Sequence, residues 1–184
     1  MKSILSLLLV LIIVLILYVF YSFRFPYLNG LIYQKIGLDH DAFAMFTQAC
    51  DTNNSLGCMQ LGVIYANGHV VEKDINKAKK FLEIAITSGT STAFTHLGMI
   101  YEQNMVTSQD LNKAFQLYQT GCNEGDGQGC LKLGDLYRYG KGTEKNVSAA
   151  KSFYHDACML KVQEGCLNVT KLKNEDIYRS RINF

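Results

Sequence analysis

Residues 121–140 read GCNEGDGQGCLKLGDLYRYG, and this stretch decides the fold. It contains two cysteines eight residues apart, Cys122 and Cys130, and then a Leu-Gly-x-x-Tyr motif that ends at Tyr137. The leucine and tyrosine of the motif are four residues apart, which places both on one face of a helix. Gly140 follows, and glycine commonly ends a helix because it tolerates the left-handed backbone conformation. The stretch therefore predicts a turn spanned by the cysteines and a helix after it.

The same features recur along the chain at a step of 36 residues. A fixed period of this length indicates a solenoid, because one unit cannot bury its apolar face without its neighbours. A stripe of small residues repeats at the same step and predicts a second helix in each unit. The repeating positions are the cysteine pairs Cys50/Cys58, Cys122/Cys130 and Cys158/Cys166, the motifs that begin at Leu61, Leu97 and Leu133, and the alanines Ala42, Ala78, Ala114 and Ala150.

The period predicts an all-α, right-handed α-solenoid of helix-turn-helix repeats. We expect helices near residues 54–67, 74–87, 90–103, 110–123, 126–139 and 146–160, with one before them at 40–50 and one after them at 162–172. Residues with N-cap chemistry stand at the expected helix starts, and Gly or Asn stands at the ends. The caps are Asn54, Thr90 and Asp126 for the first helix of a unit and Asp74, Asp110 and Asn146 for the second; the ends are Gly68, Asn104 and Gly140.

The cysteines favour disulfide bonds within each pair. One step of the period lacks both cysteines and has Ile86 and Phe94 instead, and disulfide partners are expected to be lost together. The spacing is too long for the paired cysteines of a zinc site, and no C-x-x-C motif is present. Each bridge would join the end of one helix to the first turn of the next and contribute roughly 2.5 kcal/mol. Disulfides indicate an oxidising compartment, whereas free buried thiols in a cytosolic protein are the alternative interpretation.

The Leu-Gly-x-x-Tyr-x-x-Gly core, as in residues 61–68, resembles Sel1-like repeats, which are relatives of tetratricopeptide repeats. The resemblance extends over about residues 40–172, and residues 121–134 are similar to the cysteine-rich, Hcp-like subfamily. Several members of that subfamily carry the name beta-lactamase. The resemblance therefore implies a repeat protein, with weak beta-lactam hydrolysis or penicillin binding as an alternative to a scaffold that binds proteins. A third hypothesis is an envelope assembly or secretion factor.

The N-terminal segment is apolar enough to cross a membrane. Residues 4–23 contain no charge, and a helix of this length covers about 30 Å, the thickness of the hydrocarbon layer. We expect residues 1–24 to be a signal anchor in the bacterial inner membrane, with the cysteine-containing part in the periplasm. Cleavage as a signal peptide, which would leave a secreted or periplasmic protein, is the alternative.

Three further segments complete the predicted organisation. Residues 25–39 are interpreted as a connector, since Pro26, Asn29 and Gly30 would break a helix. Residues 40–172 form the solenoid, and the polar residues 173–184 are expected to be a loosely held tail. The chain has 18 Lys and Arg against 16 Asp and Glu, so its charge gives no reason to expect nucleic acid as a partner.

The candidate binding residues lie on the first helix of successive units. Gln60, His96 and Lys132 occupy equivalent positions and are expected to form a polar row in a groove. Solenoids offer long curved surfaces, so the expected partner is another protein or a peptide, with an envelope component among the candidates. We expect no metal, cofactor or catalytic residue.

Two other motifs have simpler explanations. Ser148 and Lys151 fit the S-x-x-K motif of serine beta-lactamases, but its companions S-D-N and K-T-G are absent, and the repeat makes both residues variable helix-surface positions. Asn53 and Asn146 fit the acceptor pattern of bacterial N-glycosylation. Asparagine is also expected in these turns and caps without any modification.

Overall fold

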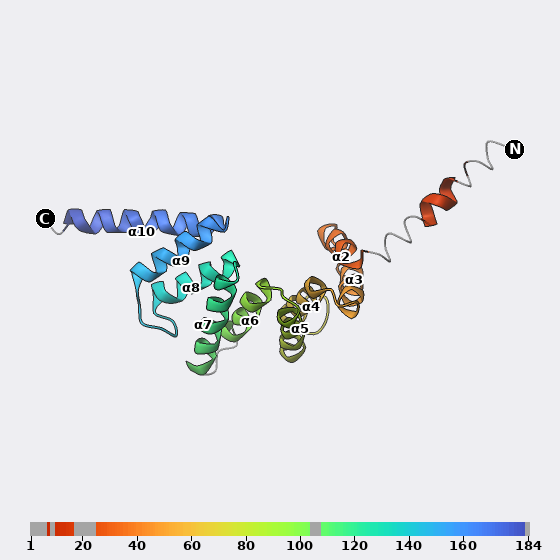
Figure 1. Ribbon diagram of the computed structural model, residues 1–184, viewed down its shortest axis with the longest axis horizontal. Coiled ribbons are helices and arrows are strands. Elements are labelled where there is room, and N and C mark those ends of the chain that lie inside the picture. The colour runs from red at the N-terminus through yellow and green to blue at the C-terminus, as the bar shows by residue number, and fades with distance from the viewer. Residues whose placement is uncertain (1–6, 8–9, 17–24, 104–107, 183–184) are drawn as a thin grey trace.

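The computed structural model describes residues 7, 10–16, 25–103 and 108–182, and within these residues it contains helices and no strands. The helices follow one another along the long axis of the molecule (Figure 1). This arrangement confirms the all-helical solenoid. The bounds are α2 Pro26–Lys35, α3 Asp39–Asp51, α4 Ser55–Asn67, α5 Ile75–Thr87, α6 Thr92–Gln103, α7 Ser108–Asn123, α8 Gly127–Tyr139, α9 Val147–Met159 and α10 Gln163–Ile182.

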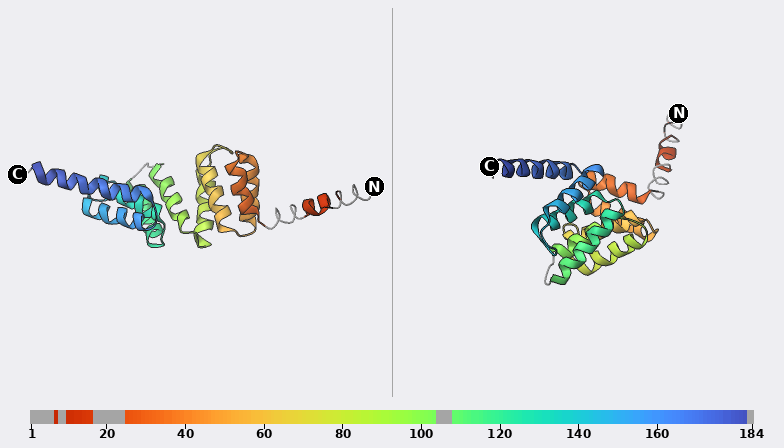
Figure 2. Two further views of the ribbon diagram at one scale, coloured as in Figure 1. Left: turned by 90° about the horizontal axis from the view of Figure 1, so that it is seen from above. Right: turned by 60° about the vertical axis from the view of Figure 1, so that its left-hand side comes forward.

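The helices alternate between two types. The Leu-Gly-x-x-Tyr motifs lie on α4, α6 and α8, here called first-type helices, and each packs on the second-type helix that follows it, α5, α7 or α9. Contacts join helices that are consecutive in the chain, together with α4 to α6 and α6 to α8. The buried side chains form a series of clusters along the stack, so the molecule is elongated (Figure 2).

The glycine of each motif allows the two helices of a unit to approach closely. A Cβ added at Gly62 would lie 2.6 Å from Leu82 Cγ, and one added at Gly134 would lie 2.7 Å from Tyr154 Cδ1. Any side chain at these positions would push the helices apart. Close packing therefore offsets the ~1 kcal/mol by which glycine disfavours a helix relative to alanine.

Turns of one kind connect each second-type helix to the next first-type helix. There are four of them when α3 is counted as a second-type helix and α10 as a first-type helix. One residue of each turn has a positive φ, and the next residue donates its backbone N–H to the carbonyl five residues earlier. The backbone therefore forms the same turn at every junction. The positive-φ residues are Asn53, Gly89, Gly125 and Lys161, and the hydrogen bonds run from Asn54 to Ala49, Thr90 to Ala85, Asp126 to Gly121 and Val162 to Ala157.

Disulfide bonds span three of these four turns. The bridges are Cys50–Cys58, Cys122–Cys130 and Cys158–Cys166, and they confirm the predicted pairing. Each joins a second-type helix to the start of the next helix, with Cα atoms 4.5 to 4.7 Å apart. The remaining turn, between α5 and α6, has half-buried Ile86 and Phe94 at the two positions that cysteines occupy in the other turns.

The residue that precedes the second cysteine, or the equivalent Phe94, differs between bridged and unbridged turns. It is glycine at the bridged turns, and a Cβ added at Gly57 would lie 2.6 Å from Ala49 Cβ. At the unbridged turn it is Ala93, which is fully buried. The contact between α5 and α6 is also less extensive than the contact across a bridged turn. The bridged helix ends are therefore packed more closely. The other two glycines of the series are Gly129 and Gly165.

Most of the predicted caps are confirmed. Four side-chain oxygens accept a hydrogen bond from a backbone N–H in the first turn of α4, α5, α8 and α9. The end residues of α4 and α8, Gly68 and Gly140, have left-handed φ values of 73° and 68°. The capping side chains are those of Asn54, Asp74, Asp126 and Asn146.

Two helix starts differ from the prediction. α7 begins at Ser108, so Asp110 lies in its first turn and is not the N-cap. Neither residue before Asp110 opposes a helix strongly, and the helix therefore begins earlier. α6 begins at Thr92, two residues after the predicted Thr90. Asn104, the predicted end of α6, lies outside the described residues.

The predicted connector at residues 25–39 is wrong, because most of it is the helix α2. Pro26 is at the start of this helix, where a missing N–H costs no hydrogen bond. Asn29 and Gly30 are buried within α2, and a Cβ added at Gly30 would lie 2.5 Å from Phe46 Cε1. Gly30 therefore serves close helix packing. The pair α2–α3 is thus a further unit of the solenoid.

The predicted tail at residues 173–184 also needs correction, because α10 continues to Ile182. Leu172 is buried, and Glu175 is ion-paired with Arg138 of α8. Thr170 and Lys173 stand where Gly134 and Tyr137 stand on α8. The surface of α10 that corresponds to the packing face of α8 is therefore polar at these two positions.

The predicted membrane helix falls largely on residues that the structure does not describe, namely 1–6, 8–9 and 17–24. Residues 10–16 are helical, and their apolar side chains are exposed. In the described parts of the chain, none of the helices combines the length and the apolar character needed to span a bilayer.

Candidate binding surface

The first-type helices provide one continuous surface, called the inner face. α6 contacts both α4 and α8. Within the described residues, no contact of similar extent joins one second-type helix to the next. Side chains on the inner face therefore come from neighbouring units and lie close enough to act on one ligand. The predicted row of candidate residues lies on these helices.

The three predicted residues differ in their surroundings. Gln60, His96 and Lys132 are all half-buried, on α4, α6 and α8. His96 lines a small pocket between α4 and α6, and the lining includes neither Gln60 nor Lys132. Whether the three act as one row stays a prediction. The other lining residues are Val63, Ala66, Asn67, Leu82, Met99, Ile100 and Gln103.

The imidazole of His96 is adapted to an apolar pocket. Burial lowers the pKa of His96, since the protein interior disfavours the charged ring, and the carboxylate of Asp126 opposes this effect in part. His96 is therefore neutral at pH 7 and offers one hydrogen-bond donor and one acceptor. This end of the inner face is suited to an uncharged part of a ligand.

Equivalent positions become more polar toward the C-terminus. The series at one position is Val63, Met99 and Asp135, and the series at another is Ala66, Glu102 and Arg138. At these two positions the inner face is therefore apolar on α4, mixed on α6 and charged on α8.

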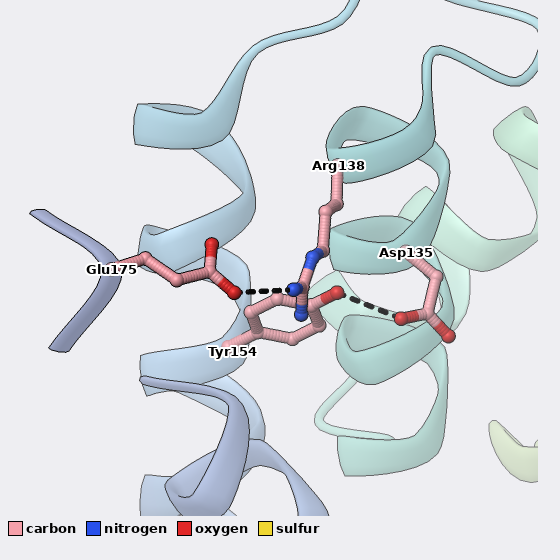
Figure 3. Close-up of polar contacts among 4 residues, drawn as sticks. All are labelled: Asp135, Arg138, Tyr154 and Glu175. Carbon is pink, nitrogen blue, oxygen red and sulfur yellow. Dashed lines mark hydrogen bonds and ion pairs between the residues drawn. The ribbon is translucent and has the colours of Figure 1, made fainter. Parts of the chain in front are cut away.

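The charged end contains a polar cluster that links three helices (Figure 3). The Tyr154 hydroxyl on α9 donates a hydrogen bond to Asp135 Oδ1 on α8 at 2.8 Å. Arg138 Nη2 on α8 lies 3.1 Å from Glu175 Oε1 on α10. In Figure 3 the guanidinium of Arg138 overlaps the ring of Tyr154 and contacts Glu175. These contacts fix the side chains at the junction of α8, α9 and α10.

Burial sets the protonation behaviour of this cluster. It raises the pKa of Tyr154, and the hydrogen bond to Asp135 raises it further. The pKa of Asp135 is raised chiefly by burial, and its hydrogen bond with Tyr154 acts in the opposite direction. Tyr154 is therefore a neutral donor at physiological pH and is unsuited to act as a base. The cluster can recognise charge and hydrogen-bonding groups.

A second tyrosine also donates to a carboxylate on the preceding first-type helix, one unit earlier. The Tyr118 hydroxyl on α7 donates to Glu102 Oε2 on α6 at 2.7 Å, and Lys141 Nζ lies 3.6 Å from the other oxygen of Glu102. Sequence reasoning missed these residues. The signal was available, because the two tyrosines are 36 residues apart where Phe46 and Leu82 stand in the earlier units.

The S-x-x-K motif is on a second-type helix and not on the first-type helices that provide the inner face. Ser148 is exposed in the first turn of α9, and Lys151 is half-buried one turn later. Over residues 7, 10–16, 25–103 and 108–182, His, Cys, Asp and Glu side chains form no group of three that could hold a metal ion.

The Sel1 repeat family model matches residues 55–90, 95–126 and 127–162, more than half of the chain. A comparison with the curated proteins gave no match. The boundaries of the three matched segments fall near the turns before α4, α6, α8 and α10. The matched unit is thus one first-type helix followed by one second-type helix.

Three solved structures are similar to this chain. The Sel1 repeat protein from Oxalobacter formigenes is 25% identical with a TM-score of 0.67, over 73% of this chain and 55% of that chain. Helicobacter pylori cysteine rich protein B is 30% identical with a TM-score of 0.53, over 68% of this chain and 90% of that chain. The protective antigen c5321 of uropathogenic Escherichia coli, which displays an SLR fold, is 18% identical with a TM-score of 0.66, over 84% of this chain and 34% of that chain, and bears on the fold alone. The chain spans about half the length of the Oxalobacter protein and about a third of c5321.

Proposed function

This chain is a member of the Sel1 repeat family, and on that premise we propose that it is a protein-interaction scaffold whose inner face binds a segment of a partner protein. The observation that carries the proposal is the change from the apolar pocket at His96 to the polar cluster at Asp135 and Arg138. The pocket at His96 is lined by α4 and α6, and the side chains of Asp135 and Arg138 are held by α9 and α10.

The chemistry of the inner face specifies the kind of segment. Apolar side chains of the partner would contact Val63 and Met99, and its polar groups would contact Glu102, Asp135 and Arg138. At the polar end, Tyr118 and Tyr154 already hold the acceptors Glu102 and Asp135, and Glu175 holds the donor Arg138. Because less side-chain entropy is lost on binding to ordered groups, this end favours affinity for a matching charge pattern.

Site-specific photocrosslinking in cells tests the proposal. A photoreactive residue replaces Ala66 or Met99 on the inner face, and Glu83, exposed on α5, provides the matched control position. We expect the two inner-face positions to capture the same partner and the control position not to capture it. Charge reversal by Arg138→Glu should then weaken that capture. Equal capture from Glu83 would contradict the assignment to the inner face.

We further propose that the chain belongs to the cysteine-rich subfamily and that its repeats lie in an oxidising compartment. The three bridges across helix junctions support both statements. The uncharged residues 4–23 support an anchor in the inner membrane, with the repeats in the periplasm. Thiol labelling of the denatured protein from intact cells measures this. Six free thiols after rapid acid quenching would contradict it.

No specific observation favours the beta-lactamase activity that the subfamily name implied. The same preparation gives a direct measurement, with a chromogenic beta-lactam as substrate. Turnover that disappears in Ser148→Ala would replace the scaffold by an enzyme. We expect no difference between Ser148→Ala and the unmodified protein.

A further inference from the structure

The tyrosines of two Leu-Gly-x-x-Tyr motifs are each covered by a phenylalanine ring. Tyr65 stacks on Phe81 with ring centroids 5.6 Å apart and planes 6° apart. Tyr137 stacks on Phe153 at 5.5 Å and 8°. In both units the phenylalanine comes from the second-type helix that follows the tyrosine. The stack therefore belongs to the standard packing of this solenoid.

The middle unit lacks this stack. Tyr101 is the equivalent tyrosine on α6, and the position of the stacking ring is occupied by Leu117 on α7. Leucine has neither the flat shape nor the length to cover a tyrosine ring. The face of Tyr101 toward α7 is consequently left without its aromatic neighbour.

A cavity of about 250 Å³ lies at this place between α6 and α7. For comparison, an apolar cavity of roughly 150 Å³ is large enough to hold benzene. Its lining combines apolar and aromatic side chains with polar ones, and none of these residues also lines the pocket at His96. The residues that line it are Leu97, Tyr101, Lys113, Gln116, Leu117 and Thr120.

The middle unit also differs in its charge. Phe43 and Phe115 place their ring edges against Tyr65 and Tyr137, whereas the equivalent residue near Tyr101 is Lys79. Its Nζ lies 4.1 Å from the centroid of the Tyr101 ring. Lys113 Nζ, on α7, lies 5.2 Å from the same centroid. Lys113 thus lines the cavity, and Lys79 adds a second ammonium group over the ring of Tyr101, which also lines it.

We propose that this cavity is a binding pocket for an aromatic side chain of a partner protein, in a segment that has acidic residues beside the aromatic one. The incoming ring takes the place that Phe81 and Phe153 fill in the other units and stacks on Tyr101. The adjacent carboxylates pair with Lys79 and Lys113. The pocket and the inner face are formed by different side chains, so the proposal does not depend on the function of the inner face.

The internal repeat supplies a blocking variant that is compatible with the fold. Leu117→Phe introduces the residue found at the equivalent position of both flanking units, and we expect it to fill the cavity and restore the stack. The probe is a capped tripeptide with phenylalanine between two glutamates. Binding to the full chain is followed by the NMR shifts of the Thr120 methyl group and the Tyr101 ring. We expect saturable binding that Leu117→Phe weakens roughly tenfold or more.

Two further variants separate the ring from the charge. Phe81→Leu opens the corresponding place beside Tyr65, where Lys77 Nζ is 5.2 Å from the ring, and is expected to create a second, weaker site. Lys113→Gln should weaken the binding of the acidic tripeptide severalfold and leave the binding of a version with two glutamines unchanged. These readouts hold even if Leu117→Phe does not fold.

Several results would overturn the proposal. Undiminished binding to folded Leu117→Phe would place the ligand elsewhere. Equal binding of a tripeptide with leucine in place of phenylalanine would remove the role of the ring. Tighter binding of free 3-phenylpropionate than of the tripeptide would reassign the pocket to a small aromatic acid. An absence of saturable binding at millimolar peptide would remove the pocket altogether.

Discussion

The turn between α7 and α8 and the turn between α5 and α6 have the same backbone hydrogen bond but are held in different ways. The first has the Cys122–Cys130 bridge and closely packed helix ends, whereas the second has half-buried apolar residues and a buried alanine. Since the turn forms in both, the bridge does not create its conformation. The comparison indicates that the bridge reinforces a junction whose shape the backbone already sets.

Removing a bridge should have the largest effect on the unfolding free energy. The double variant Cys122→Ala/Cys130→Ala is expected to lose roughly 2.5 kcal/mol of unfolding free energy, because the unfolded chain is no longer cross-linked. The turn should persist through the Asp126 to Gly121 hydrogen bond. Urea unfolding at pH 7 measures the loss. A folded variant with unchanged stability would show that the bridge adds nothing to the turn.

Adding a bridge at the other turn should have a smaller and opposite effect. Ile86→Cys/Phe94→Cys together with Ala93→Gly should make the oxidised form about 1–2.5 kcal/mol more stable than its reduced form. Without Ala93→Gly we expect a smaller gain, since the buried methyl group keeps the helix ends apart. The difference in unfolding free energy between oxidised and reduced samples isolates the bridge from the lost packing. Equal gains with and without Ala93→Gly would contradict the role assigned to the glycine.

The two junctions should also differ in how their stability depends on pH. This is the smallest of the three expected effects on stability. His96 on α6 has a lowered pKa in the folded protein, so the unfolded chain binds protons more readily. Stability should therefore fall as the pH decreases from the unfolded value of 6.5, and be fully present above it. His96→Gln, which introduces the residue found at Gln60, should reduce this slope. Urea unfolding between pH 5 and 8 measures it, with His155→Gln, exposed on α9, as the control.

The repeat period predicted the helices and bridges because it compares positions that perform the same packing task. It missed α2 because the link between α2 and α3 is shorter than in other units: Gly30 and Tyr33 precede Gly62 and Tyr65 by 32 residues, not 36. A search for the glycine–tyrosine spacing alone would have found this unit.

The binding surface was less predictable than the fold. The position of His96 on a first-type helix followed from the period, but its pocket depends on how α4 and α6 pack. The hydroxyl groups of Tyr118 and Tyr154 have partners on other helices, and their direction is set by tertiary packing. Phenylalanine and leucine at the equivalent positions of other units gave the one sequence signal for them.

The short separation of the bridged cysteines has a consequence for oxidation of the newly made chain. Every native partner is eight residues away, while the nearest wrong pairing, Cys130 with Cys158, spans 28 residues. Loop-closure statistics alone favour the shorter contact by about 1 kcal/mol. The correct pairs are thus the most frequent encounters before any helix has formed. Each pair can be oxidised without waiting for the rest of the chain.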